Sequence, residues 1–509
     1  MKIVICPTII KRTILEDHHL KIADVLQGIE YLNIDGCNLK EIDIKGLSHD
    51  SRDIEEGYLF VAIKGYAENG HKFIDEAISR GAVAVLGVEE LSNLEVPYLQ
   101  TKDTKSALGV IASQFYHHPF KNKKIVGVTG TNGKTTTTYM VKSIFEANGY
   151  QTGIIGTIQN IINGKSLPSR NTTPSAVDLY KFLYNSDDEV IVLEVSSHAL
   201  NQSRVAGIPF DVCLFTNLEG EHLDYHNSIE EYFETKYKLF KQMKPDGLAV
   251  VNFDDDWGKK VHERLLNEGA EVKTVGIDSF CDACVLHETD QVWLKEYEER
   301  KPFDLMLPGL HNQFNGAMSL MVSEGLGLDL NKSLEALRNF SNLPGRFETV
   351  DFPGNKVVVI DYAHTANGIY HCLKTARESS ANQITHVFGF RGKRDESKRE
   401  MMLENSRTLS DKYVLTLDDL NGVKESEMKN TLKKYVQSDP EQKGRVIIDR
   451  TQAIKQAIEE ADDGSWIVIT GKGHEEYQQT FRLGTRSDFD TVKYLFGEHP
   501  IFREIHLKK

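Results

Sequence analysis

Short apolar runs, separated by polar segments that contain glycine, recur along the whole chain. One run covers residues 125–128 and is followed by a glycine-containing turn. After that turn, apolar residues recur at helical spacing between positions 139 and 145. Short apolar runs are typical of buried parallel strands, and repeats of three or four residues are typical of helices. The pattern therefore predicts a strand over 125–128 and a helix from about residue 136.

The same alternation of strand and helix patterns continues on both sides of this segment. It predicts an α/β fold, because strands that alternate with helices form mostly parallel sheets. The expected elements are a short helix and turn over 22–32, a strand over 58–63, a helix over 75–80, a strand over 82–86, a helix over 232–240, and strands over 356–361, 384–388, 413–417, 445–448 and 466–470.

Chain length and a break in the pattern predict three domains. A chain of 509 residues is long enough for about three domains of ordinary size. The Pro344-Gly345 pair separates a helical pattern from a new strand, which marks a boundary. We expect a small N-terminal α/β domain over 1–105, including an extension over 1–19, a central domain over 106–344, and a doubly wound domain over 345–509.

Composition and charge exclude several classes of protein. The chain is 40% hydrophobic and 27% charged, and its formal net charge is −15. No apolar stretch approaches the roughly 20 residues that a membrane helix needs, and the N-terminus has no secretory pattern. The acidic balance argues against a nucleic-acid partner. We expect a cytoplasmic protein, a monomer, without a membrane or nucleic-acid partner.

The turn after residue 128 has the chemistry of a phosphate-binding loop. A strand, a glycine-rich turn and a helix N-terminus bind anions, because free backbone N–H groups and the helix dipole converge there. Lys134 would reach the β- and γ-phosphates, and the Thr135 hydroxyl would bind Mg²⁺. The strict Walker pattern has a glycine where this chain has Val128. The predicted ATP-binding residues are Gly130, Thr131, Asn132, Gly133, Lys134, Thr135 and Thr136.

This form of the loop resembles the ATP loop of the Mur ligases. The segments around Asp50-Ser51-Arg52 and Gly471-Lys472-Gly473-His474-Glu475 resemble the MurE-type members more specifically. The resemblance covers about residues 20–495 and implies three domains that bind a UDP-linked muramoyl dipeptide, ATP and a free amino acid. It implies ATP-dependent amide formation through an acyl phosphate, in peptidoglycan precursor synthesis.

The resemblance also implies a magnesium site and further ATP contacts. Glu194 ends an apolar strand, and ligands of parallel sheets bind at that edge, where a carboxylate suits Mg²⁺. His222 matches the family's histidine ligand, and Lys236 matches a lysine that the family carbamylates. A bare lysine near phosphate is the competing interpretation of Lys236. Residues implied to act in catalysis are Lys134, Glu194, His222 and Lys236. Those implied to bind metal are Thr135, Glu194, His222 and Lys236, and those implied to bind ATP include Asn312 and Arg346.

Contacts to the nucleotide-sugar substrate follow from the same resemblance. From the residues alone, 50–52 is a turn and cap, and the polar turn over 171–174 could cap a helix at Ala176. The implied substrate contacts are His49 and Ser51 to the uridine, with Asn171, Thr172, Thr173, Ser196, Gln202 and Arg204 to the rest of the nucleotide sugar.

The amino-acid site carries the main departure from the family. Arg394 lies in a Gly389–Asp395 loop that resembles the family's Gly-Gly-Asp-Arg-Asp, and a guanidinium matches a carboxylate. Gly471 and Glu475 would meet the same amino acid. Members that add meso-diaminopimelate carry Asp-Asn-Pro-Arg where this chain has Asp418-Asp419-Leu420-Asn421. The missing arginine argues against diaminopimelate and leaves lysine open. Asp418 and Asp419, with Asn421, suggest a pocket for a cationic amino acid.

Three hypotheses about function remain open from the sequence. The first is a MurE-type ligase, and the second is a paralogue that joins another amino acid to a different carboxylate. The altered 418–421 segment and Ala366, where the family has a proline-containing turn, support the second. The third is a non-catalytic nucleotide-binding regulatory protein. A lone Cys281-x-x-Cys284 could be a zinc or redox site, or two ordinary cysteines.

Overall fold

The computed structural model describes residues 20–34, 36–65, 68–221, 225–341 and 343–498. The described residues form two compact units. One unit comprises residues 20–127, 151–211 and 238–244, and the other comprises 128–150, 212–237 and 245–498. The predicted N-terminal extension over 1–19 and the predicted metal ligand His222 lie outside the described residues.

The N-terminal part of the first unit is built on a five-stranded sheet. Its order is β2-β7-β6-β5-β4, in which β4, β5, β6 and β7 run parallel and β2 pairs antiparallel to β7. The elements of this part are β1 (Leu20–Lys21), α1 (Ile22–Val25), β2 (Tyr31–Asn33), β3 (Asp43–Ile44), β4 (Gly46–Ser48), β5 (Tyr58–Val61), α2 (Ile74–Ser79), β6 (Ala82–Gly87), β7 (Tyr98–Thr101) and α3 (Thr104–Phe115).

The predictions for this part are confirmed for two strands and one helix. The strands expected over 58–63 and 82–86 are β5 and β6, and the helix expected over 75–80 is α2. The short helix and turn expected over 22–32 are present as α1 and the turn over 26–28, and the prediction is wrong only for residues 31 and 32. The chain instead enters β2, because pairing with the edge strand β7 satisfies its backbone groups.

An 11-stranded sheet follows in the order β11-β10-β9-β12-β8-β13-β14-β15-β16-β17-β18. Pairs β9–β12, β14–β15 and β15–β16 are parallel, whereas the outer hairpins β10–β11 and β16–β17–β18 are antiparallel. The strands are β8 (Lys124–Thr129), β9 (Thr152–Ile155), β10 (Gln159–Ile162), β11 (Lys165–Pro168), β12 (Val190–Glu194), β13 (Phe210–Phe215), β14 (Met243–Asn252), β15 (Glu271–Gly276), β16 (Ala283–Leu286), β17 (Gln291–Leu294) and β18 (Glu299–Pro302).

Seven α-helices accompany these strands. The helix expected from about residue 136 begins two residues earlier, at Lys134, and the helix expected over 232–240 covers 229–237. The helices are α4 (Lys134–Ala147), α5 (Ala176–Tyr184), α6 (Ser197–Asn201), α7 (Ile229–Tyr237), α8 (Asp256–Asn267), α9 (Leu310–Gly325) and α10 (Leu330–Arg338).

The C-terminal residues of the second unit form a six-stranded sheet of order β19-β20-β24-β21-β22-β23. All neighbours are parallel except β19, which pairs antiparallel to β20. All five predicted strands are present. The elements are β19 (Glu348–Phe352), β20 (Lys356–Asp361), α11 (Ala366–Glu378), β21 (Ile384–Phe390), α12 (Lys398–Leu409), β22 (Lys412–Leu417), α13 (Glu425–Gln437), β23 (Gly444–Val446), α14 (Arg450–Glu459), β24 (Trp466–Thr470) and α15 (Asp488–Glu498).

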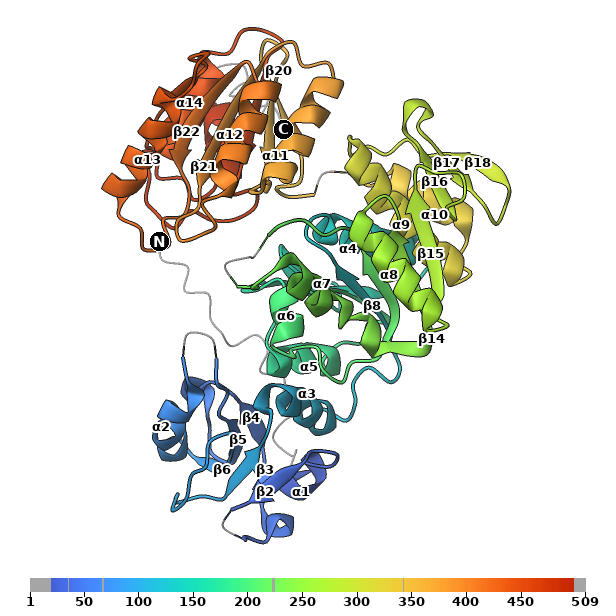
Figure 1. Ribbon diagram of the computed structural model, residues 1–509, viewed down its shortest axis with the longest axis vertical. Helices are drawn as coiled ribbons and strands as arrows, with labels where there is room; N and C mark the ends of the chain where they lie inside the picture. Colours follow the sequence, from blue (N-terminus) through green and yellow to red (C-terminus); the bar gives the residue numbers. More distant parts are fainter. Residues whose placement is uncertain (1–19, 35, 66–67, 222–224, 342, 499–509) are drawn as a thin grey trace, which may run out of the picture. The chain divides into compact units, whose positions relative to one another are not determined.

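Helices cover both faces of this sheet, which explains why its strands read as continuous apolar runs (Figure 1). Val359 packs in a core with side chains from α11, α12 and α13. Its neighbours Val358 and Ile360 point to the opposite face, where they pack with α14 and α15. Alternate side chains of one strand therefore pack into two separate cores, one on each face of the sheet. The predicted doubly wound arrangement is confirmed.

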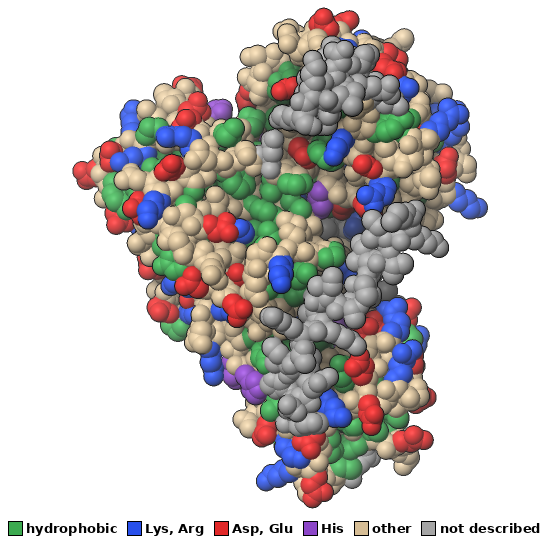
Figure 2. Space-filling view, turned by 180° about the vertical axis from the view of Figure 1, so that it is seen from behind, with side chains coloured by type: hydrophobic (Ala, Val, Ile, Leu, Met, Phe, Trp, Pro, Cys, Tyr) green, Lys and Arg blue, Asp and Glu red, His purple; other side chains and the backbone are tan. Residues whose placement is uncertain are grey.

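No helix in the described part of the chain is both long and apolar enough to cross a membrane. On the face drawn in Figure 2, acidic and basic side chains are interspersed, with small apolar areas between them.

Candidate active site

Two glycines shape the loop between β8 and α4. Gly130 has φ 148° and Gly133 has φ 82°, conformations that side chains with a β-carbon rarely adopt. A β-carbon on Gly130 would collide with Thr216 Oγ1, and one on Gly133 would lie 2.6 Å from Asn315 Oδ1. Because Gly133 is the N-cap of α4, the first N–H groups of that helix face the loop. The loop thus has the form of an anion site.

The strand end after β13 holds the loop in place. The backbone N–H of Thr131 donates to the carbonyl of Asn217 over 2.9 Å, and the N–H of Asn132 donates to Asn217 Oδ1, also over 2.9 Å. Thr216 Oγ1 donates to the carbonyl of Asn132 over 2.6 Å. These bonds hold the loop backbone from outside the loop.

Two lysines converge on the loop carbonyls. Lys134 Nζ donates to the carbonyls of Gly130 and Thr131 over 2.9 and 2.8 Å, and Lys236 Nζ donates to the same Gly130 carbonyl over 2.7 Å. Lys236 is 1% exposed and lies over the ring of Tyr232. Its burial, reinforced by the charge of Lys134, holds the pKa of Lys236 well below its ordinary value. A lysine in this state loses its proton more readily than an exposed lysine does.

The predicted ATP residues Arg346 and Asn312 both belong to this neighbourhood. Arg346 Nη2 donates to Thr135 Oγ1 over 3.0 Å, and its guanidinium lies over the ring of Tyr362. Asn315, which lies against Gly133, contacts Asn312 Oδ1 at 3.4 Å. The remaining member of the predicted set, Thr136, is buried in the first turn of α4.

Two acidic residues that depart from the family pattern contact α11 and the turn before it. Glu219 accepts hydrogen bonds from Asn132 and from Asn367, the latter short. Glu221 lies 3.1 Å from His364 Nε2. Burial raises the pKa of Glu219 in spite of these bonds. The two glutamates after β13 thus find polar partners in α11 and in the turn before it.

Glu194 is the end of β12 and is completely buried in the first unit. Thr157 donates to both carboxylate oxygens, from its backbone N–H and from its hydroxyl, each over 2.8 Å. The Thr157 hydroxyl also lies 3.2 Å from Thr172 Oγ1. The carboxylate is therefore oriented at the strand edge, as predicted, and does not face open solvent.

The residues predicted to hold the nucleotide sugar gather around Thr173. The Thr173 hydroxyl donates to the carbonyl of Glu194 over 2.8 Å and lies 3.3 Å from Ser196 Oγ. Arg204 donates to the carbonyl of Thr173 over 2.7 Å and to Gln202 Oε1 over 2.8 Å. A polar cluster with one guanidinium results, which suits a phosphate-bearing substrate.

The predicted capping role of 171–174 was wrong. Helix α5 begins at Ala176 as expected, but its N-cap is Ser175, whose side chain accepts from the N–H of Asp178. Ser175 precedes the helix directly and is one of the best capping residues. Asn171 is exposed, and its carbonyl accepts from Ser169.

The two predicted uridine contacts differ in their surroundings. His49 Nδ1 is buried and has no hydrogen-bond partner among the described residues. Burial lowers the pKa of His49, with Asp178 opposing and Arg204 adding to the effect, so His49 faces the polar cluster. Ser51 opens a short turn capped by Asp50, and its hydroxyl donates to Glu76 of α2. The turn-and-cap interpretation of 50–52 is thus correct for its local structure.

The predicted amino-acid residues come together where β21, β22 and β24 end. Asp418 and Asp419 follow β22, whereas Gly471 and Glu475 follow β24. Gly471 has φ 111°, and a β-carbon there would lie 2.7 Å from Asp418 Oδ2. Asn421 donates to the carbonyl of Gly392. The exposed Arg394 lies in the loop after β21.

The sequence reasoning missed three residues of this cluster. Arg391 donates to the carbonyl of Gly471 over 2.7 Å and to Glu475 over 2.6 Å. Lys472 Nζ donates to both carboxylate oxygens of Asp419 over 2.8 Å. Tyr362 donates to Glu475 over 3.0 Å and, because burial raises its pKa to about 12, stays protonated. The available signal was an arginine in a glycine-rich loop at the edge that carries the acids.

Neither the Cys281–Cys284 pair nor a cavity elsewhere in the structure adds a residue to the predicted site. Among the described residues no three side chains that could bind a metal lie together. Cys281 and Cys284 are buried free thiols, and burial raises the pKa of Cys281 to about 12.

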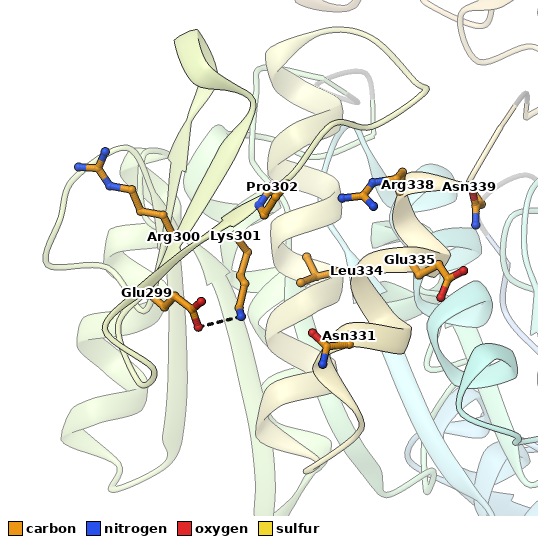
Figure 3. Close-up of a pocket in the computed structure, with 9 residues that line it drawn as sticks. All are labelled: Glu299, Arg300, Lys301, Pro302, Asn331, Leu334, Glu335, Arg338 and Asn339. Carbon is orange, nitrogen blue, oxygen red and sulfur yellow. Dashed lines mark ion pairs between the residues drawn. The ribbon is translucent and has the colours of Figure 1, made fainter.

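A cavity of about 590 Å³ lies between β18 and α10. Figure 3 shows Glu299 and Lys301 joined by an ion pair on one side of it. Lining groups of both signs give it no clear ligand.

Comparisons with known proteins agree with this arrangement. Residues 43–116 match the family model described as Mur ligase family, catalytic domain. Residues 128–323 match the Mur ligase middle domain, and residues 345–473 match the Mur ligase, glutamate ligase domain.

Named relatives cover most of the chain. A UDP-N-acetylmuramoyl-L-alanyl-D-glutamate–2,6-diaminopimelate ligase of Clostridium botulinum is 37% identical over 473 residues, 89% of this chain and 94% of the relative. A protein of the same name from Caldanaerobacter subterraneus is 36% identical, covering 90% and 95%. A solved structure with that name superimposes with a TM-score of 0.64 at 26% identity and covers 94% of this chain and 98% of the other.

Proposed function

Because the chain belongs to the Mur ligase family, we propose that it joins an amino acid to the carboxylate of UDP-MurNAc-L-Ala-D-Glu at the expense of ATP, in peptidoglycan precursor synthesis. The predicted family, fold class and ligase activity are confirmed by the comparisons. The observation that carries the proposal is the complete loop from Gly130 to Thr136, held in an anion-binding conformation. We further propose domain bounds of 1–105, 106–344 and 345–509 and a cytoplasmic monomer.

The loop residues would bind the phosphates of ATP. Lys134 already lies against the loop carbonyls, from which its ammonium can turn to the β- and γ-phosphates. Phosphoryl transfer needs positioned positive charge more than an elaborate nucleophile. The substrate carboxylate attacks the γ-phosphorus of ATP to give an acyl phosphate and ADP, and the amino group then displaces phosphate, with loss of a proton, to leave an amide.

The side chains proposed to hold Mg²⁺ carry the kinds of donor that this ion takes, which are carboxylate and hydroxyl oxygens. Thr135 supplies a hydroxyl, and Glu194 supplies a buried carboxylate that Thr157 orients. His222, outside the described residues, stays a predicted ligand. When bound, Mg²⁺ would neutralise phosphate charge.

Lys236 has the properties that carbamylation requires. Only an uncharged amine adds CO₂, forming an N–C bond and releasing one proton to leave a carbamate anion. The lowered pKa of the buried Lys236 favours the uncharged amine. A carbamate there would replace an ammonium by an anionic oxygen donor next to the loop. We therefore propose a carbamylated Lys236, and loss of turnover in Lys236→Ala that small carboxylic acids restore would support it.

The C-terminal cluster would bind the amino acid. Arg394 is the proposed partner of its α-carboxylate, because a guanidinium fork matches a carboxylate. Asn421 stands where family members that add diaminopimelate carry arginine, so we propose that the substrate is a different amino acid from the one in the relatives' names.

Phosphate release tests the proposal. The purified full-length protein is assayed with ATP, UDP-MurNAc-L-Ala-D-Glu and single amino acids. We expect turnover with one amino acid, and a complete loss in Lys134→Ala. Lys142→Ala is the matched control, because Lys142 lies on the same helix and its ammonium pairs with Glu146 one turn further along.

Each result has a definite meaning. Turnover that requires both the UDP substrate and an amino acid supports the proposal. ATP binding without turnover on any amino acid would show that the carboxylate substrate is a different one, as in the paralogue hypothesis. Turnover in Lys134→Ala equal to that in Lys142→Ala would refute the role of the loop.

A further inference from the structure

We propose that Arg391 is a specificity-determining residue that restricts the amino acid to those with a single amino group and disfavours lysine and diaminopimelate. The inference rests on the proposed function and names the substrate class of its amino-acid site. It assigns a role to a side chain that the sequence reasoning did not single out, and it reverses the expectation of a cationic amino acid.

The topology places the participating residues at one sheet edge. Strand β21 lies between β24 and β22, and all three run parallel. The loops after them therefore leave the same edge, with Arg391 in the middle loop. Asp418 and Asp419 leave the edge on one side of Arg391, and Lys472 and Glu475 leave it on the other.

Arg391 fills the space between these acids. Its Nη2 donates to Glu475 over 2.6 Å and to the carbonyl of Gly471 over 2.7 Å, and its Nε lies 3.8 Å from Asp418 Oδ1. The guanidinium also lies 5.2 Å from the centre of the Tyr362 ring. The side chain is 13% exposed, so these contacts form in a mostly desolvated place. An ammonium of a substrate side chain would have to compete with Arg391 for the same oxygens.

The second acid of the pair is also occupied. Lys472 is 2% exposed and donates to both oxygens of Asp419 over 2.8 Å. Lys472 also lies 3.5 Å from Glu475. Of the carboxylate oxygens in this cluster, Asp418 Oδ2 is buried without a hydrogen-bond partner among the described residues.

The charge balance of the cluster decides what it accepts. Three carboxylates, on Asp418, Asp419 and Glu475, face two cations, on Arg391 and Lys472. Burial opposes ionisation of Asp418 and Glu475, but the neighbouring cations outweigh it and hold both pKa values below the ordinary range. One negative charge is left over.

That single charge matches the α-ammonium of an amino acid. A second ammonium, as in lysine or diaminopimelate, would meet carboxylates that the chain itself already neutralises, with Arg391 beside it. Like charges brought together in a desolvated site repel strongly. The pair behind the cluster offers no further acid, because Arg450 and Asp488 are both fully buried and bound to each other.

The loop sequence supports a change of charge at this site. When the loop is aligned on Arg394, the family pattern Gly-Gly-Asp-Arg-Asp places a glycine at position 391. This chain thus has an arginine at 391 and an asparagine at 421, where diaminopimelate-adding members have arginine. Compared with the family pattern, this chain therefore has a positive charge at position 391 and none at position 421.

Amino-acid preference measures this directly. Full-length wild type and Arg391→Gly are assayed for kcat/KM by phosphate release with ATP and UDP-MurNAc-L-Ala-D-Glu, using glycine, L-alanine and L-serine against L-lysine and meso-diaminopimelate. In wild type we expect the best single-amine substrate to exceed both diamines by at least about tenfold. In Arg391→Gly, which frees Asp418 and Glu475, the ratio of diamine to single amine should rise at least about tenfold.

Three further variants separate charge from structure. Arg391→Lys should keep the wild-type preference, and Arg391→Met, which keeps the apolar stem, should behave as Arg391→Gly does and replaces it if that variant does not fold. Arg445→Gln is the matched control, since Arg445 makes an exposed pair with Glu460. Its preference should equal that of wild type.

The outcomes distinguish this inference from the proposed function. Wild-type preference for a diamine, or an unchanged preference in both Arg391→Gly and Arg391→Met, overturns the inference while the ligase function stands. If no amino acid supports turnover, the proposed acceptor is wrong, and calorimetric binding of the same amino acids decides the inference. Tighter binding of single amines supports it, and binding of diamines as tight, or of none, overturns it.

Discussion

Replacing Gly133 by alanine tests whether the loop conformation underlies ATP turnover. Gly133 has φ 82°, and a residue with a β-carbon pays about 1–2 kcal/mol to adopt such a conformation. The new β-carbon would also lie 2.6 Å from Asn315 Oδ1, the atom that accepts a hydrogen bond from Thr137. Moving Asn315 away breaks that bond, which costs about 1 kcal/mol. We expect Gly133→Ala to lose roughly 2–3 kcal/mol of stability.

Gly149 provides a matched control on the same helix. It follows the C-cap of α4 with φ 93°, but nothing lies within 4 Å of the position of its β-carbon. Gly149→Ala therefore carries the conformational cost alone, about 1–2 kcal/mol. The difference between the two variants isolates the contact with Asn315.

Urea unfolding followed by tryptophan fluorescence gives the stabilities, and ATP-dependent phosphate release gives the activity. A shift of the loop by about 1 Å is expected to lower kcat roughly 100-fold in Gly133→Ala. Gly149→Ala should retain wild-type kcat, since Gly149 lies at the far end of α4. Full turnover in Gly133→Ala, or equal stability losses in the two variants, would refute the reasoning.

Three other perturbations have definite expected results. In CO₂-free buffer Lys236→Met should gain stability over wild type at pH 7, because burial lowers the pKa of this lysine, so that the folded chain binds the lysine proton less tightly than the unfolded chain does. That gain should shrink as the pH rises towards 10.5, and urea unfolding that shows it growing instead would contradict the assignment. Arg450→Met leaves Asp488 buried and unpaired, so unfolding should show a loss of about 3–5 kcal/mol, whereas the exposed Arg445→Met should lose less than about 1 kcal/mol. Arg394→Ala should raise the KM for the amino acid with little change in the KM for ATP, and steady-state kinetics with an unchanged amino-acid KM would exclude its role.

The two glutamates after β13 show how a departure from a family pattern can be compensated in space. Glu219 accepts from Asn132 of the loop and from Asn367 of α11, and Glu221 lies beside His364. Asn367 lies at the start of α11, where the family pattern has a proline-containing turn. Glu219 and Asn367 are 148 positions apart in the chain, so no local sequence pattern connects the two altered segments.

The order of elements was determined largely by the sequence. Strands such as β20 and β24 were predicted to the residue, because strands buried on both faces need continuous apolar side chains. The phosphate loop was also readable, since only glycine adopts the backbone angles found at Gly130 and Gly133 without strain. Features that depend on the residue type at each position can therefore be recognised from the sequence.

Only the tertiary structure decided which charges meet. The sequence offered Asp418 and Asp419 as partners for a cationic substrate, but Lys472 and Arg391, from loops on other strands, neutralise them. Parallel strands bring loops that are distant along the chain to one edge of the sheet. Which side chains form ion pairs there depends on their length and direction, and the spacing of residues along the sequence does not give either. The same holds for Lys236, whose lowered pKa follows from complete burial against the loop. The sequence therefore determined the fold and the reaction class, and the packing of the sheet edge determined the charge that the amino-acid pocket presents.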